Sequence, residues 1–406
     1  QSQTSGGNLS GSFTRGLTRL GRTRINNRLQ LTDQQLDERL QLSRTSVLTD
    51  MTAARGAQAV PAGLQKLVND QGTDARYHIN RPLAAGGMGA VLDIQDNDFR
   101  RGAAMKVIHG KFADDPQALE RFLAEAQVTA QLEHPNIVPI HDMGVMPDGS
   151  LYFTMKLIEG LSLGEVVKLQ RIHYGLLSRA DYLSEKERKE AAKSADVRKS
   201  SDQIAAEYET DMAKGAELAA RFTHEETLLM FLKVLDGVGF AHSRGVVHRD
   251  IKPDNIMLGA HGEVLVVDWG IAKVLKKADR DNAFVQKIER EVVSLRDEHA
   301  ISATMTGSAM GTLFYMPPEQ ARGDLDQIDG CSDIYALGAT LYELIALKRC
   351  LEVKSLPEAL AAITTGDWIP LDRAVPTLDK DLVAIVHRAM ALDPNKRYND
   401  CAAFAD

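Results

Sequence analysis

The chain has 406 residues, and its 48 Lys and Arg are outnumbered by 56 Asp and Glu, which gives a formal net charge of −8. This balance gives a general nucleic-acid-binding role no support. With 44% hydrophobic and 26% charged residues, the composition is that of a globular protein long enough for two domains or one large two-lobed domain.

The cysteines and the apolar runs of the sequence indicate the cellular compartment in which we expect the protein. Cys331, Cys350 and Cys401 are widely spaced, which argues against a structural zinc site and favours a reducing compartment. No apolar run approaches the roughly 20 residues that a membrane helix needs, and the longest candidate contains Glu343. Gln1 is not an initiator, and no apolar core of a signal peptide follows it. We therefore expect a cytoplasmic location and an excised piece of a longer protein.

Residues 1–75 are predicted to form a tail. The first 30 residues contain five arginines and no acidic residue, and apolar residues fall at helical spacing beside the arginines. The arginines are Arg15, Arg19, Arg22, Arg24 and Arg28, and the apolar residues are Leu9, Phe13, Leu17 and Leu20. One interpretation is a basic amphipathic helix for a membrane surface or a partner. The Gly, Ser and Thr content favours disorder instead.

From Tyr77 onward the sequence predicts regular structure. Residues 77–96 are typical of two strands joined by a glycine turn, and residues 102–110 are typical of a third strand. Apolar residues at helical spacing predict a helix over residues 115–132. Residues 136–158 return to a strand pattern with a turn between two strands, and after them the chain becomes mostly helical.

Because strands and helices fall in separate blocks, we predict an α+β fold in two lobes. The small β-rich lobe spans residues 76–157, and the larger helical lobe spans residues 158–406. Within the larger lobe, residues 168–222 are dense in Lys, Glu, Asp and Ala, and we interpret them as a solvated helical insert. The insert carries a thin apolar stripe of Val197, Ile204, Tyr208 and Met212.

A glycine cluster joins the first two predicted strands, in the sequence LAAGGMGAVL. Glycines lack a Cβ and let backbone N–H groups approach phosphate oxygens, although such a cluster alone is typical of a plain hairpin turn. Lys106 follows 17 residues after Gly89 in an apolar strand, and Glu125 follows 19 residues later in the predicted helix. A lysine in an apolar strand needs a counter-charge, which Glu125 would supply. The alternative is two unrelated surface charges.

The stretch VVHRDIKPDNIMLG concentrates polar side chains between apolar runs. Asp250 could accept a proton from an incoming hydroxyl, Lys252 could neutralise a moving phosphoryl group, and Asn255 could bind a metal ion through its carbonyl oxygen. Asp268 ends an apolar strand 18 residues beyond Asp250, in a position suited to holding Mg²⁺. Phosphoryl transfer needs cradled phosphates, fixed metals and an aimed nucleophile, and these residue types would supply them. The alternative is a polar turn.

The order of these motifs resembles that of a known family. Residues 77–406 are similar to the Hanks-type (eukaryotic-like) protein Ser/Thr kinases, in the style of their bacterial branch. The motifs are, in chain order, AAGGMGAV, AAMK, RFLAEAQ, HPNIVPI, TMKLIEG, HRDIKPDN, DWG, GTLFYMPPE, SDIYALG and DPNKRY. The resemblance implies the two-lobed protein kinase fold and an ATP site. The implied ATP-binding residues are Leu83, Ala84, Gly86, Gly87, Met88, Gly89, Val91, Ala104, Lys106, Met155, Lys156, Leu157 and Ile158.

The resemblance also implies catalytic roles. Lys106 would contact the α- and β-phosphates and pair with Glu125, Asp250 would be the catalytic base, and Lys252 would lie beside the γ-phosphate. Mg²⁺, or Mn²⁺ as an alternative ion, would be held by two residues, Asn255 and Asp268. The position of Lys252, two residues past the base, fits Ser/Thr rather than Tyr specificity.

Further residues are expected to have structural or regulatory roles by the same resemblance. Thr312 would pack near Asp250 and Lys252, Glu319 would pair with Arg397, and Asp333 would be buried in the next helix. Arg249 precedes the base, a pattern that the family links to control by phosphorylation of the activation segment, because an arginine can pair with a phosphate.

The activation segment, residues 268–319, is long. Val285, Ile288, Val292 and Leu295 fall at helical spacing and predict a short helix over residues 279–300. The candidate phosphorylation sites of this segment are Thr304, Thr306, Ser302 and Ser308. For each one, an unmodified loop residue is the alternative.

Three departures from the family pattern occur: Ala84 stands in place of the first loop glycine, Trp269 in place of Phe, and Pro317 in place of Ala. Because every catalytic position is filled, we predict an ATP- and Mg²⁺-dependent kinase of protein Ser/Thr hydroxyls that also phosphorylates itself. A pseudokinase scaffold is the alternative, and a small-molecule kinase is disfavoured by the GTLFYMPPE segment. Protein substrates are the expected partners, and whether the chain forms a homodimer stays open.

Overall fold

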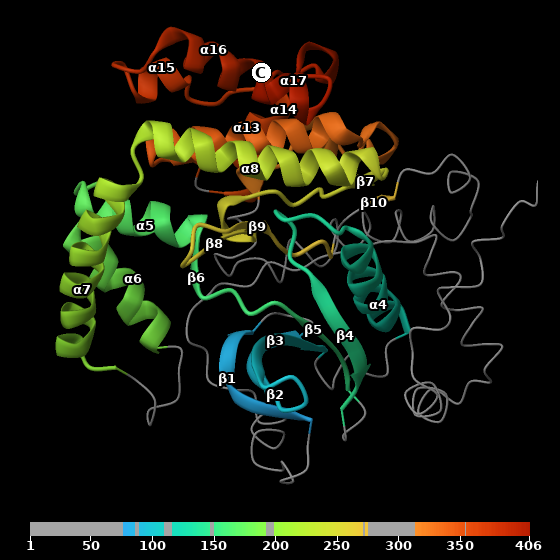
Figure 1. The fold of residues 1–406 in the computed structure, drawn as a ribbon. Coiled ribbons are helices and arrows are strands. Elements are labelled where there is room, and N and C mark those ends of the chain that lie inside the picture. The colour runs from blue at the N-terminus through green and yellow to red at the C-terminus, as the bar shows by residue number, and fades with distance from the viewer. Residues whose placement is uncertain are drawn as a thin grey trace, which may run out of the picture.

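The computed structural model describes residues 76–85, 89–108, 116–146, 150–191, 199–270, 273–274, 313–353 and 355–406. The predicted tail over residues 1–75 and the predicted helix over residues 279–300 lie outside these ranges. In the described part a strand-rich lobe is followed by a larger helical lobe (Figure 1). The predicted α+β fold class is confirmed.

The smaller lobe is built on a five-stranded antiparallel sheet. Its strands are β1 (Tyr77–Ala85), β2 (Gly89–Asp96), β3 (Arg101–Ile108), β4 (Ile140–Val145) and β5 (Leu151–Met155), in the spatial order β1-β2-β3-β5-β4. Because side chains alternate between the faces of a strand, Leu92, Ile94 and Met105 are buried together on one face. The helix α4 (Pro116–Gln131) contributes Phe122 to a second cluster, where its ring lies 5.1 Å from that of Phe153.

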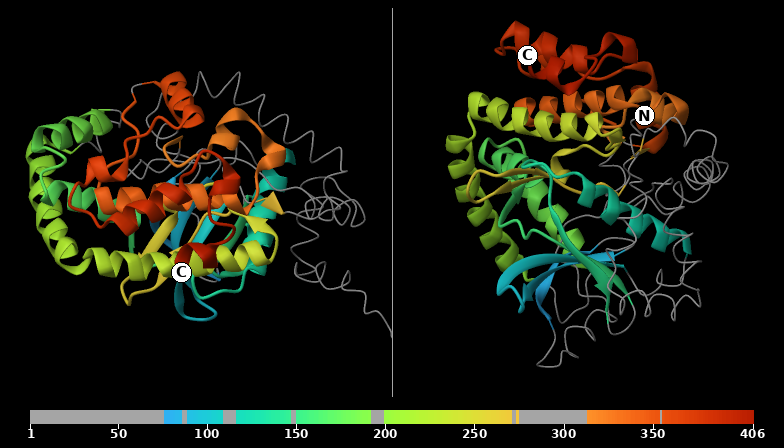
Figure 2. Two further views of the ribbon diagram at one scale, coloured as in Figure 1. Left: turned by 90° about the horizontal axis from the view of Figure 1, so that it is seen from above. Right: turned by 45° about the vertical axis from the view of Figure 1, so that its right-hand side comes forward.

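Two long helices form the centre of the larger lobe. α8 (His224–Ser243) and α13 (Gly330–Ala346) lie side by side in Figure 1 and in both views of Figure 2. Most residues of α13 are buried, because its sequence is apolar on nearly every side. Within the described ranges, no helix combines the length and the apolar character needed to cross a bilayer.

Shorter elements complete this lobe and pack around the two central helices. α12 (Pro318–Arg322) contacts α14 (Leu356–Thr365), α15 (Leu371–Ala374) and α16 (Lys380–Ala389) pack on α13, and α17 (Cys401–Ala405) packs on α8. Two 3-10 turns, η6 (Leu325–Gln327) and η7 (Pro394–Lys396), connect these helices. The result is one large apolar core that also includes Val128 of α4 and Val167 of α5 (Leu163–His173) and reaches Phe404 near the end of the chain.

Short strands lie between the two lobes. β6 (Gly160–Ser162), β8 (Ile256–Gly259) and β9 (Val264–Val266) form a sheet in the order β6-β8-β9, and β7 (Val246–Val247) pairs with β10 (Lys273–Val274). The segment after α4 reaches this sheet: Ile137 forms a bridge to Val266, and Asn136 Nδ2 donates to the Val264 carbonyl at 2.9 Å. These contacts tie the smaller lobe to the strand that leads to Asp268.

The insert adds two helices beside α5 (Leu163–His173), namely α6 (Arg179–Ala191) and α7 (Ser201–Arg221), at the side of the larger lobe (Figure 1). Its apolar stripe is not solvated, because Ile204 and Tyr208 are buried in a cluster with Ile172 and Tyr182. The interpretation of a solvated insert is therefore wrong for this stripe, of which Val197 lies outside the described residues. The physical reason is that α5 supplies an apolar surface on which α7 packs.

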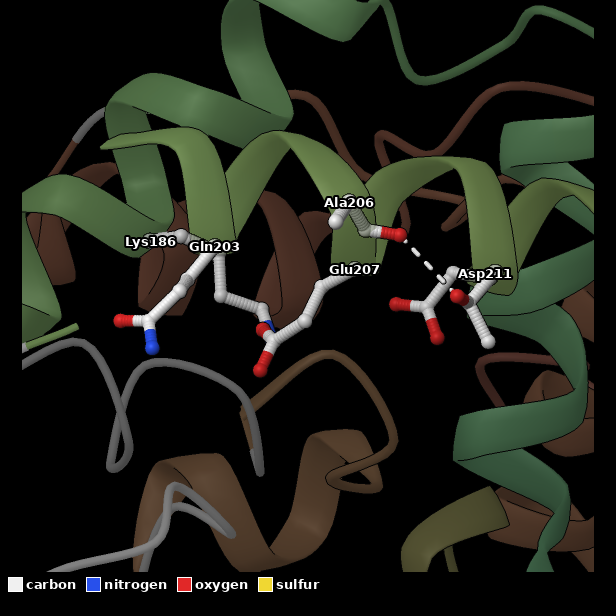
Figure 3. A pocket seen from close by; sticks show the side chains of 6 residues that line it. Lys186, Gln203, Ala206, Glu207 and Asp211 are labelled. Carbon is white, nitrogen blue, oxygen red and sulfur yellow. Dashed lines mark hydrogen bonds and ion pairs between the residues drawn. The ribbon is translucent and has the colours of Figure 1, made fainter. Parts of the chain in front are cut away.

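A shallow hollow of about 480 Å³ lies between α6 and α7 (Figure 3). Its charged side chains are paired within the insert: Lys186 Nζ lies 3.1 Å from Glu207 Oε2, and Asp211 accepts a hydrogen bond from the Tyr182 hydroxyl at 2.7 Å. The lining residues are Lys186, Gln203, Ala206, Glu207, Thr210 and Asp211. All of them belong to α6 and α7, so the hollow is separate from the polar loop that follows β7.

His387, on α16, makes the packing of α15 sensitive to pH. Its Nε2 accepts a hydrogen bond from the Leu371 N–H at 3.0 Å, and its ring lies edge-on to Trp368 at 5.0 Å. Burial lowers the pKa of His387. The nearby Asp372 raises the pKa, but less than burial lowers it. A depressed folded-state pKa contributes stability above the unfolded value near 6.5 that is lost as the pH falls towards the folded value.

We expect His387→Gln to reduce the loss of stability between pH 7 and pH 5. The glutamine oxygen can still accept from the Leu371 N–H, but it does not titrate, so the difference from the wild type should grow below pH 6.5 up to about 1 kcal/mol, the typical net value of one hydrogen bond. Urea unfolding at several pH values measures this difference. Parallel pH dependence of the two proteins would contradict the assignment.

Candidate active site

The segment after β7 carries the predicted base, and a buried carboxylate shapes its backbone. Asp333 of α13 is 0% exposed and accepts hydrogen bonds from the N–H groups of His248 at 2.7 Å and Arg249 at 2.8 Å. Arg249 has φ of 69°, a left-handed conformation that costs a non-glycine residue roughly 1–3 kcal/mol. Asp333 therefore holds a strained turn directly before Asp250.

Asp250, Lys252 and Asn255 form one hydrogen-bonded group. Asp250 Oδ2 accepts from Lys252 Nζ at 2.7 Å and from Asn255 Nδ2 at 3.0 Å. Asn255 lies on the 3-10 turn η5 (Pro253–Asn255), and its Nδ2 also donates to the Asp250 carbonyl at 2.8 Å. Burial raises the pKa of Asp250 although Lys252 opposes the change. A carboxylate with a raised pKa is a stronger base than an ordinary one.

A second group joins β3, α4 and the segment after β9. Lys106 Nζ lies 2.5 Å from Glu125 Oε1 and 3.4 Å from Asp268 Oδ1. Burial alone would lower the pKa of Lys106, but Asp268 and Glu125 raise it above its ordinary value, so the ammonium group stays charged. Burial alone would raise the pKa of Asp268, but Lys106 and Lys252 hold it below its usual range. Lys252 thus connects the two groups electrostatically.

Asp268 and Asn255 fit the requirements of a Mg²⁺ site, which prefers oxygen ligands. Asn255 uses its Nδ2 for Asp250, which leaves its carbonyl oxygen as the atom suited to a metal. Asp268 has φ of 64°, a second strained non-glycine turn. At Gly270 a Cβ would lie 3.2 Å from Glu125 Oε2 and 3.5 Å from Asp268 Oδ1, so a glycine there leaves both carboxylates room.

The register of the sheet places several predicted ATP-binding residues on one face. Ala84 pairs with Val91, and Val91 pairs with Lys106 on the next strand. Because cross-strand partners share a face, these three side chains lie in one row. Ala104 lies two residues before Lys106 and pairs with Met155, which extends the row to β5. The sheet therefore offers one continuous surface beside the Lys106 ammonium group.

The remaining predicted nucleotide contacts of the sheet lie near the glycine cluster. Leu83 is exposed on β1. Gly89 begins β2 at a position where a Cβ would lie 2.3 Å from the Val107 carbonyl oxygen, so only glycine fits there. Gly86, Gly87 and Met88 lie outside the described residues.

The segment after β5 links the lobes, and its first residue is held twice. The Lys156 N–H donates to the Pro139 carbonyl at 3.1 Å, and Lys156 Nζ lies 2.7 Å from Glu263 Oε1 in the turn between β8 and β9. Since the N–H and the side chain are both engaged, the backbone carbonyl of Lys156 is the part suited to a nucleotide. Leu157 and Ile158 follow it directly, half-buried.

The predicted partners Glu319 and Arg397 also meet. Both side chains are 0% exposed, and two parallel bonds of 2.8 Å join Arg397 Nη1 and Nη2 to the Glu319 carboxylate. Arg397 Nε donates to the Ala391 carbonyl at 2.8 Å, and the Ser332 hydroxyl donates to Glu319 at 2.7 Å. Five further predicted residues of the activation segment lie outside the described ranges: Thr312, Thr304, Thr306, Ser302 and Ser308.

His248 and Trp269 have a role that the sequence analysis missed. His248 Nδ1 accepts from the Asp250 N–H at 3.2 Å, and its Nε2 lies 3.2 Å from the Val267 carbonyl oxygen. The buried Trp269 ring lies 4.5 Å from the His248 ring. His248 thus connects the loop of the base to the segment of Asp268. The only sign of this contact in the sequence is that His248 lies two residues before Asp250 and that Trp269 directly follows Asp268.

Comparisons with known proteins bear on the family of this chain. The family model described as "Protein kinase domain" matches residues 77–405. A Serine/threonine-protein kinase PknD of Protochlamydia amoebophila is 31% identical over 324 residues, which cover 79% of this chain and 28% of the relative. The protein of the same name from Chlamydia muridarum is 32% identical over 331 residues, 80% of this chain and 30% of the relative. The chain thus spans under a third of the length of these curated relatives.

Among solved structures, the PknI kinase domain of Mycobacterium tuberculosis is 22% identical, with a TM-score of 0.47 over 86% of this chain and 98% of that chain. The family match covers both lobes and every described residue of the two hydrogen-bonded groups. The resemblance noted in the sequence is confirmed. The chain belongs to the protein kinase domain family.

Proposed function

We propose that this chain transfers the γ-phosphoryl group of ATP to Ser and Thr hydroxyls of proteins, including its own. The observation that best supports this proposal is the hydrogen-bonded group of Asp250, Lys252 and Asn255, which Lys252 connects electrostatically to Asp268 and the Lys106–Glu125 pair. A base, two cations and two metal-binding oxygens are the parts that phosphoryl transfer requires.

Each residue has a role that follows from its contacts. Asp250 orients the acceptor hydroxyl and takes its proton, since burial raises its pKa. Lys252 balances charge on the transferred group, and Lys106 binds the other phosphates while Glu125 holds it in place. When bound at Asn255 and Asp268, Mg²⁺ supplies positive charge to the phosphate oxygens. The row from Ala84 to Met155 receives the adenosine part of ATP.

Regulation, partners and location are further parts of the proposal. Protein substrates are the acceptors, and phosphorylation of the activation segment controls activity, with Arg249 placed next to the base. All three cysteines, Cys331, Cys350 and Cys401, are free thiols, which fits a reducing compartment such as the cytoplasm.

The proposal is tested with γ-labelled ATP, MgCl₂ and a mixed protein acceptor. We expect label on Ser and Thr of the acceptor and of the chain, and loss of transfer when EDTA removes the metal. Asp268→Asn should lower transfer at least about 10²-fold, because it removes the negative charge of a metal-binding side chain. The control Asp236→Asn makes the same change on an exposed part of α8 and should match the wild type. Nucleotide binding without any transfer would instead indicate a scaffold.

A further inference from the structure

The turn between β8 and β9, residues 260–263, contacts the segment after β5 that links the lobes. Lys156, the first residue of that segment, places its Nζ 2.7 Å from Glu263 Oε1. Near the other end of the segment, the Ala260 N–H donates to the Glu159 carbonyl at 2.8 Å. One turn of the larger lobe therefore holds the linking segment near both of its ends.

This turn is itself fixed by its own backbone and by α8. The Gly259 N–H donates to the Glu263 carbonyl at 2.9 Å, and the Gly262 N–H donates to the Gly259 carbonyl at 3.2 Å. Gly262 has φ of 83°, a left-handed conformation that a glycine adopts without strain. Lys233 of α8 donates from its Nζ to the Gly262 carbonyl at 3.2 Å. The turn is therefore anchored on a central helix of the larger lobe.

The Glu263 carboxylate is oriented within the turn. Its Oε2 accepts from the His261 N–H at 3.2 Å, and its Oε1 accepts from Lys156 Nζ. At Gly259 a Cβ would lie 2.1 Å from Glu263 Oε2, so a side chain there would displace the carboxylate. Lys156 and the His261 N–H hold the pKa of Glu263 below its usual range, so the group that meets the ammonium is charged.

The backbone of Lys156 is restricted by these contacts. Its N–H donates to the Pro139 carbonyl and its side chain pairs with Glu263, so its carbonyl is the group that faces a ligand. Lys156 directly follows Met155, the end of the row proposed to receive adenosine. A carbonyl accepts from the amino group of adenine, whereas guanine has an acceptor oxygen at that place.

We propose that Glu263 is a positioning residue for nucleotide binding, which acts through Lys156 and favours adenine over guanine. The inference rests on the proposed function for the identity of its nucleotide. Glu263 itself lies in a turn of the larger lobe and acts on the nucleotide only through the linking segment, by restricting that segment before the nucleotide binds.

The test measures the dissociation constants of ADP and GDP by titration calorimetry, together with kcat for labelled ATP. Glu263→Met and Lys156→Met should each weaken ADP binding about two- to fivefold, the range for a pair whose side chains are 34% and 39% exposed, with kcat and the GDP constant within about twofold. The double variant should be no weaker than either single variant, because both remove the same interaction. Lys156→Arg keeps the positive charge and should retain the wild-type affinity within about twofold.

Glu217→Met is the matched control, because it removes the same charge at an exposed position of α7, and it should change none of these constants. Unchanged ADP binding in either single variant, equal losses for ADP and GDP, or a double variant whose loss is the product of the two single losses would overturn the role of Glu263. A wild-type chain that binds ADP without any transfer would overturn the proposed function, while the affinities would still decide the role of Glu263. A wild-type chain that binds no ADP would overturn both.

Discussion

Asp250→Asn is expected to lower the rate of phosphoryl transfer about 10²- to 10⁴-fold, the usual contribution of a positioned general base. The amide oxygen can still accept from Lys252, so the loop should keep its shape while losing the group that takes the hydroxyl proton. Because burial raises the pKa of Asp250, the wild-type rate should also fall on the acid side as this carboxylate is protonated. Initial rates with labelled ATP, measured across pH, check both expectations.

Asp254→Asn is a matched control for this experiment. It removes the same charge from an exposed position of the same loop. Its rate on a mixed acceptor should stay within about threefold of the wild type, and the nucleotide affinity of Asp250→Asn should also be retained. If both variants lost activity equally, general charge on the loop rather than a base at position 250 would explain the result.

Arg397→Met is expected to destabilise the larger lobe by about 3–5 kcal/mol, since it leaves the Glu319 carboxylate buried without its partner. The loss also removes bonds from the guanidinium group to the Ala391 and Cys331 carbonyls. Arg397→Lys should recover only part of the difference, because an ammonium group cannot make the two parallel bonds. Urea unfolding followed by far-UV circular dichroism measures the change.

The control for this pair is a surface pair of similar geometry. Arg322 Nε lies 2.9 Å from Asp324 Oδ2, but both side chains are 37% exposed. Arg322→Met should therefore change the free energy of unfolding by less than about 1 kcal/mol. The double variant Arg397→Met with Glu319→Met should be more stable than Arg397→Met alone, because no charge is left buried. Equal effects of the buried and surface single variants would refute the argument.

The parts of the site that could be predicted are those where chemistry demands a residue type. A lysine in an apolar strand requires a counter-charge, which is why Glu125 could be named as the partner of Lys106. Asp250, Asn255 and Asp268 could be named because acid and amide oxygens recur at motif spacing. The α+β class could be predicted because apolar residues recur every two residues in one block of the sequence and about every 3.6 residues in another.

Contacts that depend on packing between distant segments could not be predicted. The stripe of Ile204 and Tyr208 shows helical periodicity, but periodicity does not reveal that α5 covers it. Lys156 and Glu263 are 107 positions apart, and His242 and Cys401 are 159 apart. None of these pairs has a local signal, because each forms only once the helices and the two lobes are in place.

The left-handed turns at Arg249 and Asp268 have a consequence for how the protein tolerates change. Each costs roughly 1–3 kcal/mol that a glycine would not incur, so glycine at either position would relieve the strain of the backbone. The side chains of Arg249 and Asp268 are the ones that the proposed function uses. At these two positions, the residue that activity requires is therefore not the residue with the least backbone strain. Destabilising substitutions elsewhere in the two lobes are therefore tolerated only while the packing of the lobes contributes more free energy than the strain at these two turns costs.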